Sequence, residues 1–200
     1  PTPARAVEAE GLRVGHPAES TCGDDWMMRQ TRSGTDILLC DGLGHGPRAA
    51  EAAAEIIAPA QATTPTPART ISHLSETLTG GRGAVAAMIR IGEPDLMLSY
   101  SGLGNITTLC IGQSGTKRFA VRDGRIGGAP MSGFEDTLQL EPGDLAIMHS
   151  DGLKTLRDSH FRPGLLRRSP LLIAAFLIDR AFRGRDDASI VVARIRETAS

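Results

Sequence analysis

The sequence reads Thr35-Asp36-Ile37-Leu38-Leu39-Cys40-Asp41-Gly42-Leu43-Gly44-His45-Gly46, and the organisation of the whole chain can be worked out from this stretch. Residues 35–41 form a short apolar run that ends in a carboxylate, which is typical of a buried strand. The glycine-rich segment after Asp41 predicts a tight turn. Pro47 follows it, where proline suits the first position of a helix. The stretch therefore predicts a strand, a turn and a helix, with Asp41 at the end of the strand.

Two helices are expected after this turn. The first covers the alanine-rich residues 49–57, and a linker rich in Thr and Pro follows at residues 62–67. In the second, apolar side chains recur at helical spacing and two glycines end the pattern. These residues are Ile71, Leu74 and Leu78, followed by Gly80-Gly81.

The rest of the chain consists mainly of short apolar segments separated by glycine, aspartate and proline turns, which is typical of antiparallel strands. The segments are residues 84–91, 95–100, 106–111, 117–121, 144–150 and 188–195, with an apolar helix at 169–182. Helices grouped among runs of hairpin-connected strands favour an α+β fold with mostly antiparallel sheets over a doubly wound sheet. We expect residues 1–200 to form a single domain.

The composition argues against several classes of function. Lys and Arg number 22 against 23 Asp and Glu, a net charge of -1, so no global field attracts nucleic acid or an anionic membrane. Three cysteines without a Cys-x-x-Cys motif suggest buried thiols in a reducing compartment. The longest apolar stretch, residues 171–178, is too short to span a bilayer, and no apolar segment of a signal peptide is evident. We expect a cytoplasmic protein with neither nucleic-acid nor membrane partners.

Four acidic sites share a local pattern in which a carboxylate lies beside glycine or a turn. They are Asp24, Asp41, Asp151 and the pair Asp186-Asp187. Three of the four lie at ends of predicted strands, where carboxylates can converge on one point. A glycine after the aspartate, such as Gly42, lets the backbone approach closely enough for its carbonyl to serve as another oxygen ligand.

Oxygen donors without a cluster of His and Cys favour Mg²⁺ or Mn²⁺ over Zn²⁺. Several carboxylates in one cleft repel each other unless a cation neutralises them or one takes up a proton. A pair of metal ions lowers the pKa of bound water, and this suits hydrolysis of a phosphomonoester. However, Asp-Gly after an apolar run is also a common turn signal, and a lone aspartate can cap a helix or lie on the surface. Spacing alone leaves both interpretations open.

Seven motifs occur in a fixed order between residues 22 and 192. They are Cys22-Gly23-Asp24, Asp41-Gly42-Leu43-Gly44-His45-Gly46, Arg82-Gly83-Ala84-Val85-Ala86, Gly102-Leu103-Gly104-Asn105, Gly127-Gly128-Ala129-Pro130, His149-Ser150-Asp151-Gly152-Leu153 and Arg185-Asp186-Asp187-Ala188-Ser189-Ile190-Val191-Val192. This ordered set resembles the metal-dependent type-2C protein phosphatases, in particular the bacterial sporulation stage II E branch. Within that branch it is most similar to the small stand-alone phosphatases of stressosome signalling.

The resemblance implies an αββα sandwich, in which two antiparallel sheets are flanked by helix pairs and the metals lie at one end. It implies that Asp41 bridges two metal ions and that Gly42 offers its backbone carbonyl. Asp151 and Asp186 then complete the ligands of the other ion, and Asp24 acts directly or through water. In the acidic pair the family's ligand is the first position, so Asp186 is expected and Asp187 is a secondary candidate.

The activity implied by the resemblance is Mn²⁺- or Mg²⁺-dependent hydrolysis of phosphoserine or phosphothreonine by metal-activated water. The expected substrate is a phosphorylated STAS-domain protein of a stressosome or partner-switching pathway. The main alternative is a catalytically inactive pseudophosphatase that serves as a binding module in the same pathway. The retained carboxylates argue against it, since a binding module has no reason to hold repelling charges together. Hydrolysis of a small phosphoester metabolite is a weaker third option, and a monomer is favoured over a dimer.

The resemblance also leaves residues whose roles stay open. Many larger relatives carry a His directly after the bridging Asp-Gly as a proposed general acid, but this chain has Leu43 there. His45 lies two residues further on and is expected to be a turn residue near the site, with an acid role as the alternative. Asn105 suits either a turn or a function, and His149 is expected in the core. Trp26, on a strand predicted after Asp24, is expected in the core, with a place at the rim of the site as the alternative. Candidates to bind phosphate are Arg29, Arg48 and Arg82, and the cluster Arg162, Arg167, Arg168 is either a solvated face or a contact to an acidic partner.

Overall fold

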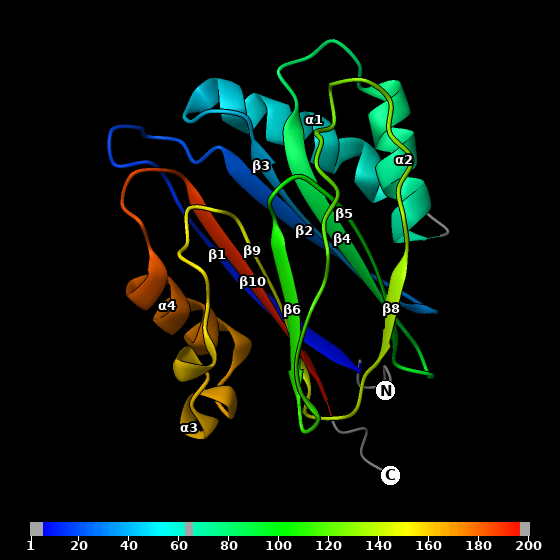
Figure 1. The fold of residues 1–200 in the computed structure, drawn as a ribbon, viewed down its shortest axis with the longest axis vertical. Coiled ribbons are helices and arrows are strands. Elements are labelled where there is room, and N and C mark those ends of the chain that lie inside the picture. Colours follow the sequence, from blue (N-terminus) through cyan, green and yellow to red (C-terminus); the bar gives the residue numbers. More distant parts are fainter. Residues whose placement is uncertain (1–5, 63–65, 197–200) are drawn as a thin grey trace.

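The alternating apolar segments build two five-stranded antiparallel sheets in the computed structural model, which describes residues 6–62 and 66–196. The strands are β1 (Val7–Val14), β2 (Asp24–Thr31), β3 (Gly34–Gly42), β4 (Ala84–Gly92), β5 (Met97–Leu103), β6 (Thr107–Gly112), β7 (Gly115–Arg118), β8 (Asp136–Gln139), β9 (Leu145–His149) and β10 (Ala188–Ile195). One sheet has the order β1-β10-β9-β6-β7 and the other the order β2-β3-β4-β5-β8. The two sheets pack face to face (Figure 1).

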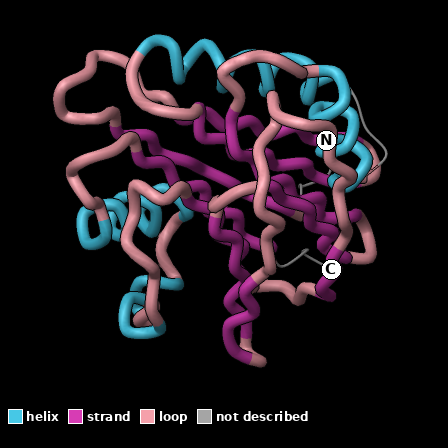
Figure 2. Tube along the Cα trace, turned by 45° about the horizontal axis from the view of Figure 1, so that its top comes forward, coloured by secondary structure: helices cyan, strands magenta, loops and turns pink. Residues whose placement is uncertain are grey.

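Helices cover the outer face of each sheet, as Figure 2 shows. Helices α1 (Pro47–Ala62) and α2 (Pro67–Thr77) pack on the sheet that contains β2 and β3. Helix α4 (Pro170–Ala181) packs on β1 and β10, preceded by the short α3 (Pro163–Leu166) and the 3-10 helix η1 (Asp158–His160). The predicted αββα sandwich is confirmed. None of the helices in the described parts of the chain is long and apolar enough to cross a membrane.

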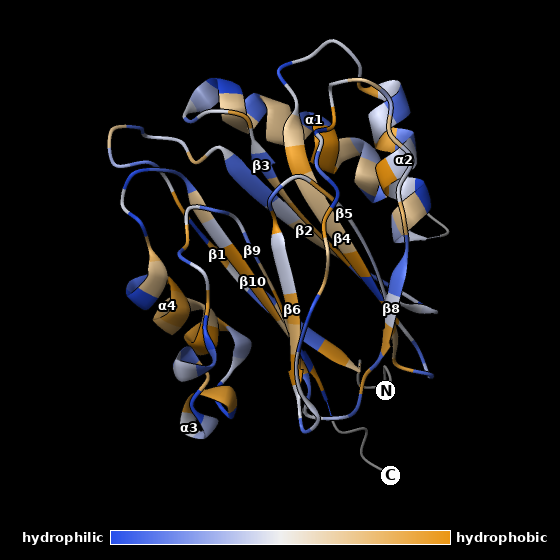
Figure 3. Ribbon diagram, viewed as in Figure 1, coloured by the Kyte–Doolittle hydropathy of each residue, from blue (hydrophilic) through white to orange (hydrophobic). Residues whose placement is uncertain are grey.

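Strand β3 explains why the opening stretch is so apolar. Its side chains alternate between two buried layers, because a strand presents successive residues to opposite faces. Ile37 and Leu39 point into the layer between the two sheets, while Leu38 and Cys40 point into the layer beneath α1. A strand that is covered on both faces becomes a continuous apolar run. Figure 3 shows the same apolar colouring in the central strands of both sheets.

The observed elements differ from the expected ones at two strands. No element was expected at β1, which has Gly11 in its middle. The structure requires that glycine, since a Cβ there would lie 2.6 Å from Cε2 of Trp26. Trp26 is partly buried and packs against the layer between the sheets, in agreement with the favoured expectation of core packing. Strand β8 was also missed, because it pairs only with β5 at the edge of its sheet and carries mostly polar residues.

Most other expected elements are confirmed, with shifted ends. The first helix is longer than residues 49–57, since α1 runs from Pro47 to Ala62. The strand expected at 117–121 is placed earlier, because β7 pairs with β6 through a tight hairpin and ends at Arg118. The linker expected at 62–67 falls partly on residues 63–65, which lie outside the described residues.

Candidate metal centre

The carboxylate-bearing ends of four segments lie at one end of the sandwich (Figure 1). Asp24 begins β2 and Asp41 lies one residue before the end of β3, and the two face each other in the β2–β3 ladder. The Gly42 N–H extends this contact by donating to the Gly23 carbonyl at 3.2 Å. Like charges directly opposite each other destabilise a sheet, so this pair needs a compensating partner.

Asp24 is fully buried, and within the described residues only one of its two carboxylate oxygens accepts a hydrogen bond. The Ser189 hydroxyl donates to Asp24 Oδ2 at 2.6 Å, whereas Oδ1 has no hydrogen-bond partner among the described residues. The pKa of Asp24 is raised to about 6, mainly by burial and also by the charges of the acidic pair before β10. Hydrogen bonds from the hydroxyls of Ser150 and Ser189 lower this pKa and so oppose the rise. A buried carboxylate oxygen without a donor suits coordination of a cation.

The charge at Asp41 is the most strongly disfavoured in this group. Burial is the largest cause, and the charges of Asp24, Asp151 and the acidic pair Asp186-Asp187 add to it, raising the pKa of Asp41 to about 9. The four predicted sites therefore lie close enough together to act on one carboxyl group. Without a cation, Asp41 holds a proton at neutral pH.

Asp151 follows β9 in a turn and is held by a residue from another segment. Asn105, just before β6, donates from Nδ2 to Asp151 Oδ2 at 2.7 Å. Burial and then the charge of Asp186 raise the pKa of Asp151, and Arg183 opposes the rise. The structure thus favours a functional role for Asn105 over a simple turn.

The two residues of the acidic pair occupy different environments. Asp187 is buried, and its Oδ1 accepts the His16 N–H at 2.8 Å, while its Oδ2 has no partner within the described chain. Asp186 is half-buried, and its Oδ1 accepts the Asp187 N–H at 2.9 Å. Asp187 therefore anchors the loop after β1, and Asp186 is the more accessible carboxylate.

Close packing accounts for the glycines that follow two of the aspartates. A Cβ on Gly42 would lie 2.0 Å from the Ala49 carbonyl oxygen in α1. A Cβ on Gly152 would lie 1.9 Å from the Asp187 carbonyl oxygen. Any side chain at either position would push the turn away from its neighbour, so both turns are held against the body of the fold.

His45 is exposed and belongs to a small polar cluster beside these turns. Its Nδ1 lies 2.8 Å from Glu19 Oε1, and its ring stacks on His16 with centroids 4.4 Å apart. This cluster links the loop after β1 to the turn after β3. The place expected for His45 near the site is consistent with this contact.

Two of the candidate phosphate-binding arginines have other partners. Arg29 Nη2 pairs with buried Asp36 at 2.6 Å, further along the β2–β3 ladder. Arg82 donates to the Leu43 carbonyl at 2.9 Å and so fixes the turn after Asp41. Arg48 is exposed in the first turn of α1.

Buried His149 bonds through Nδ1 to the Ser150 carbonyl at 2.8 Å, as expected for a core histidine, and burial lowers its pKa to about 4.

The chemistry of these residues suits a divalent cation, but their side chains do not form a compact group of ligands. Among residues 6–62 and 66–196, no three His, Cys, Asp or Glu side chains form a group close enough to hold a metal ion. The donor set nevertheless consists of carboxylates that repel one another, and Asp24 keeps a buried oxygen without a donor. Hard oxygen donors of this kind favour Mg²⁺ or Mn²⁺.

Sequence reasoning missed the supporting residues of this site. Ser189 and His16 each hold one carboxylate, and Glu19 holds His45. No spacing rule indicates these contacts, because they join parts of the chain that lie far apart. The only signal available was the position of Ser189 inside a matched motif.

Comparisons with known proteins agree with this fold. The model of a family described as stage II sporulation protein E (SpoIIE) matches residues 31–196. Among solved structures, one described as the bacterial stressosome, a modular system adapted to control secondary messenger signalling, has a TM-score of 0.85 and 25% identity, with 94% of this chain and 99% of that chain covered. RsbX in complex with magnesium has a TM-score of 0.84 and 23% identity, with 94% and 95% covered.

A third structure contains the phosphatase domain and a regulatory fragment of SpoIIE from Bacillus subtilis. It has a TM-score of 0.80 and 21% identity, with 97% of this chain and 64% of that chain covered. No sequence among the curated proteins matches this chain significantly.

Proposed function

Because the chain belongs to the stage II sporulation protein E family and is a phosphoprotein phosphatase, we propose that it hydrolyses phosphoserine or phosphothreonine with divalent metal ions. One observation carries the metal dependence. Carboxylates from four separate segments lie at one end of the sandwich and together disfavour ionisation of Asp41, whose pKa is raised to about 9 by burial and by these neighbours. A cation is the simplest means of ionising all of them at neutral pH.

In the proposed site, Asp41 would bridge two Mn²⁺ or Mg²⁺ ions and Gly42 would contribute its carbonyl. Asp151 and Asp186 would hold one ion, and Asp24 would act directly or through water. When bound, such ions supply a water that ionises near neutral pH and positive charge for the phosphoryl oxygens.

The protein's own contribution is to orient these groups. Asn105 fixes Asp151, and Ser189 fixes Asp24, each through one hydrogen bond to one carboxylate oxygen. Outer contacts of this kind tune metal affinity. Asp187 holds the loop after β1 through the His16 N–H and is proposed as a support of the site.

The proposed substrate is a phosphorylated STAS-domain protein of a stressosome or partner-switching pathway in the cytoplasm. This proposal is supported by the similarity to a structure described as the bacterial stressosome and to RsbX. The proposal covers residues 1–200 as one catalytic domain that acts as a monomer.

A second candidate is a pseudophosphatase that only binds a partner. It is favoured by one observation, namely that the described residues contain no group already close enough to hold a metal. Against it stands the cost of the buried and crowded carboxylates, which a binding module could replace with neutral residues.

The deciding experiment compares the parent, Asp41→Asn and a control, Glu141→Gln. Glu141 is exposed in the turn before β9, at the opposite end of that strand from Asp151. We expect Mn²⁺ to support hydrolysis of p-nitrophenyl phosphate by the parent and the control, with no turnover in EDTA or by Asp41→Asn. Calorimetry should show Mn²⁺ binding to the parent. A parent that neither binds Mn²⁺ nor turns over would support the binding module instead.

A further inference from the structure

A pocket of about 420 Å³ lined by basic side chains lies beside the candidate metal centre. Its lining residues are Lys154, Thr155, Arg157, Ser159, His160, Arg180 and Arg183. None of the seven is acidic, although the chain as a whole has one more acidic than basic residue. The pocket therefore concentrates positive charge, although the molecule as a whole has a net charge of -1.

Backbone hydrogen bonds join this pocket to the turn that carries Asp151. The Arg183 N–H donates to the Gly152 carbonyl at 2.9 Å, and the Lys154 N–H donates to the Ala181 carbonyl at 2.8 Å. Arg183 Nε also donates to the Leu153 carbonyl at 3.2 Å. The wall of the pocket is thus continuous with one edge of the site.

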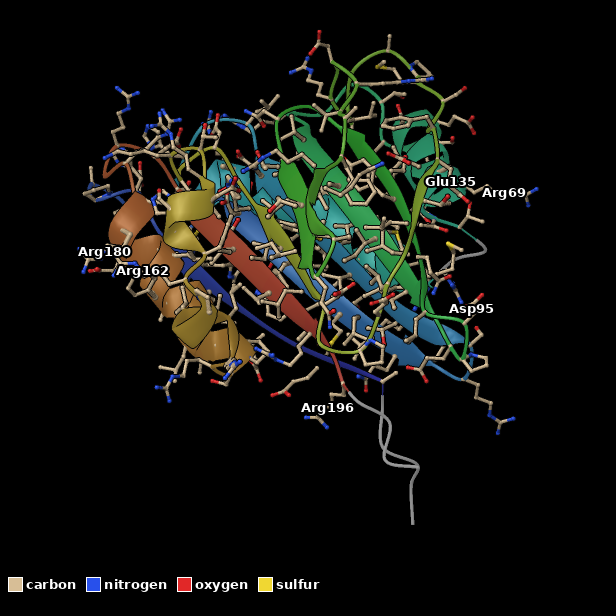
Figure 4. All side chains as sticks on the ribbon, turned by 60° about the horizontal axis from the view of Figure 1, so that its bottom comes forward. Arg69, Asp95, Glu135, Arg162, Arg180 and Arg196 are labelled. Carbon is tan, nitrogen blue, oxygen red and sulfur yellow. The ribbon has the colours of Figure 1, made fainter. Side chains whose placement is uncertain are left out.

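The basic side chains come from two different segments, so one local cause does not explain them. Arg180 lies in the last turn of α4, where a cation interacts favourably with the helix dipole. Lys154 and Arg157 come from the loop between β9 and η1, where no helix C-terminus is present to favour a positive charge. In Figure 4, Arg180 and Arg162 lie on the side of the molecule formed by α3 and α4, away from Arg69 on α2.

Few carboxylates neutralise these cations. Within the described residues, the only ion pair of a lining side chain joins Arg180 Nε to Asp179 Oδ2 at 3.5 Å, and both side chains are largely exposed. Exposed pairs of this kind contribute little. Asp158 in η1 and Asp151 of the candidate centre also lie nearby; the charge of Arg183 acts on Asp151, but neither carboxylate forms an ion pair with a lining residue in the part of the chain described. Scattered basic residues usually form a solvated face of a protein. That interpretation does not explain why these residues line a concave pocket that has no acidic lining residue and is joined to the Asp151 turn by backbone hydrogen bonds.

We propose that this basic pocket binds an acidic segment of the phosphoprotein substrate and thereby selects which phosphoproteins are accepted. The inference rests on the proposed phosphatase function. Lys154 is three residues from Asp151, a chain length that spans at most about 10 Å. An acidic residue about three positions from the phosphoserine therefore matches the separation between pocket and site.

The test uses two fluorescent phosphoserine peptides, one with Asp and Glu flanking residues and one with Gln and Ser at the same positions. Binding is measured by fluorescence anisotropy in EDTA, so that it does not depend on turnover. We expect the parent to bind the acidic peptide about tenfold more tightly, a preference that weakens with added salt. The double variant Lys154→Gln/Arg157→Gln should lose most of this preference, while the control Arg69→Gln keeps it.

Turnover with Mn²⁺ supplies the second measurement. In the double variant the KM for the acidic peptide should rise about fivefold to tenfold, with kcat and the hydrolysis of p-nitrophenyl phosphate unchanged. Equal affinity of the parent for both peptides would overturn the proposal, as would equal losses in the double variant and in Arg69→Gln.

An acidic peptide that carries Ser in place of phosphoserine should still bind better than its neutral counterpart. If only inorganic phosphate competes for the pocket, it is a phosphate site and the proposal is wrong. Absence of turnover with retained binding preference would instead refute the phosphatase function alone.

Discussion

Replacing Asp41 with asparagine should make the metal-free protein more stable while it abolishes turnover. The pKa of Asp41 is raised from 3.8 to about 9, first by burial and then by the charges of Asp24, Asp151 and the acidic pair before β10. An amide of nearly the same shape has no charge to desolvate. It should therefore relieve a cost that the parent bears whenever no cation is bound.

The sign and size of this effect follow from proton linkage. Between pH 3.8 and about 9 the folded protein holds a proton on Asp41 that the unfolded chain has lost, so the stability of the parent falls as pH rises. Each pH unit corresponds to about 1.4 kcal/mol, which sets an upper bound of about 4 kcal/mol at pH 7. Because several carboxylates share the repulsion, we expect a gain on the order of 2 kcal/mol at pH 7 and almost none near pH 4.

Urea unfolding in EDTA at pH 5, 6, 7 and 8 measures this difference, with Glu141→Gln as the matched change of one carboxylate elsewhere. The curve of Asp41→Asn should be flatter with pH than those of the parent and the control. Added Mn²⁺ should stabilise the parent and not the variant. The reasoning is refuted if Asp41→Asn is less stable than the parent at pH 8 in EDTA, or if both lose stability with the same slope.

Three further outcomes test other parts of the structure. Asn105→Ala should weaken Mn²⁺ binding by about tenfold in calorimetry, because it releases the carboxylate of Asp151; an unchanged affinity would remove Asn105 from the site. Gly42→Ala should cost about 2–4 kcal/mol in urea unfolding, since its Cβ would lie 2.0 Å from a carbonyl oxygen of α1. Gly164→Ala, which meets open space, should be nearly neutral, and similar losses in both variants would contradict the packing argument. Burial raises the pKa of Cys110 to about 12, so a thiol reagent at pH 8 should label Cys110 only in urea, and rapid labelling of the native protein would show that the β6 layer opens.

The fold could largely be predicted because its central strands and helices carry strong periodic patterns. Strand β3 is buried on both faces and is therefore apolar throughout, and α2 begins with Thr66 as its N-cap and Pro67 in its first turn. Strand β1 escaped prediction because its Gly11 accommodates the ring of Trp26. That requirement depends on a neighbouring strand and leaves no periodic trace in the sequence of β1 itself.

The site could be predicted only as far as its acidic residues. One local pattern, a carboxylate beside glycine or a turn, marked Asp24, Asp41, Asp151 and the pair Asp186-Asp187, and the ordered set of motifs then favoured Asp186 within the pair. The residues that hold them could not be found this way, because the Ser189–Asp24 and His16–Asp187 hydrogen bonds join positions 165 and 171 residues apart. The first contact forms only when the two sheets pack against each other, and the second only when β1 pairs with β10.

The hydrogen bonds of these carboxylates separate a ligand from a turn residue more clearly than their spacing does. Asp24, Asp151, Asp186 and Asp187 each accept a donor on one oxygen, and the other oxygens of Asp24 and Asp187 are buried without a donor within the described chain. An aspartate that merely closes a turn satisfies itself with nearby backbone N–H groups, as Asp186 does in part. The other three are held by donors from distant segments, which fixes the orientation of the carboxylate and leaves one oxygen available. Asp41 has no such donor in the described parts of the chain and has the pKa most strongly raised, by burial and by its acidic neighbours. The proposed cation would offset the repulsion among these carboxylates and so account for the way in which they are oriented.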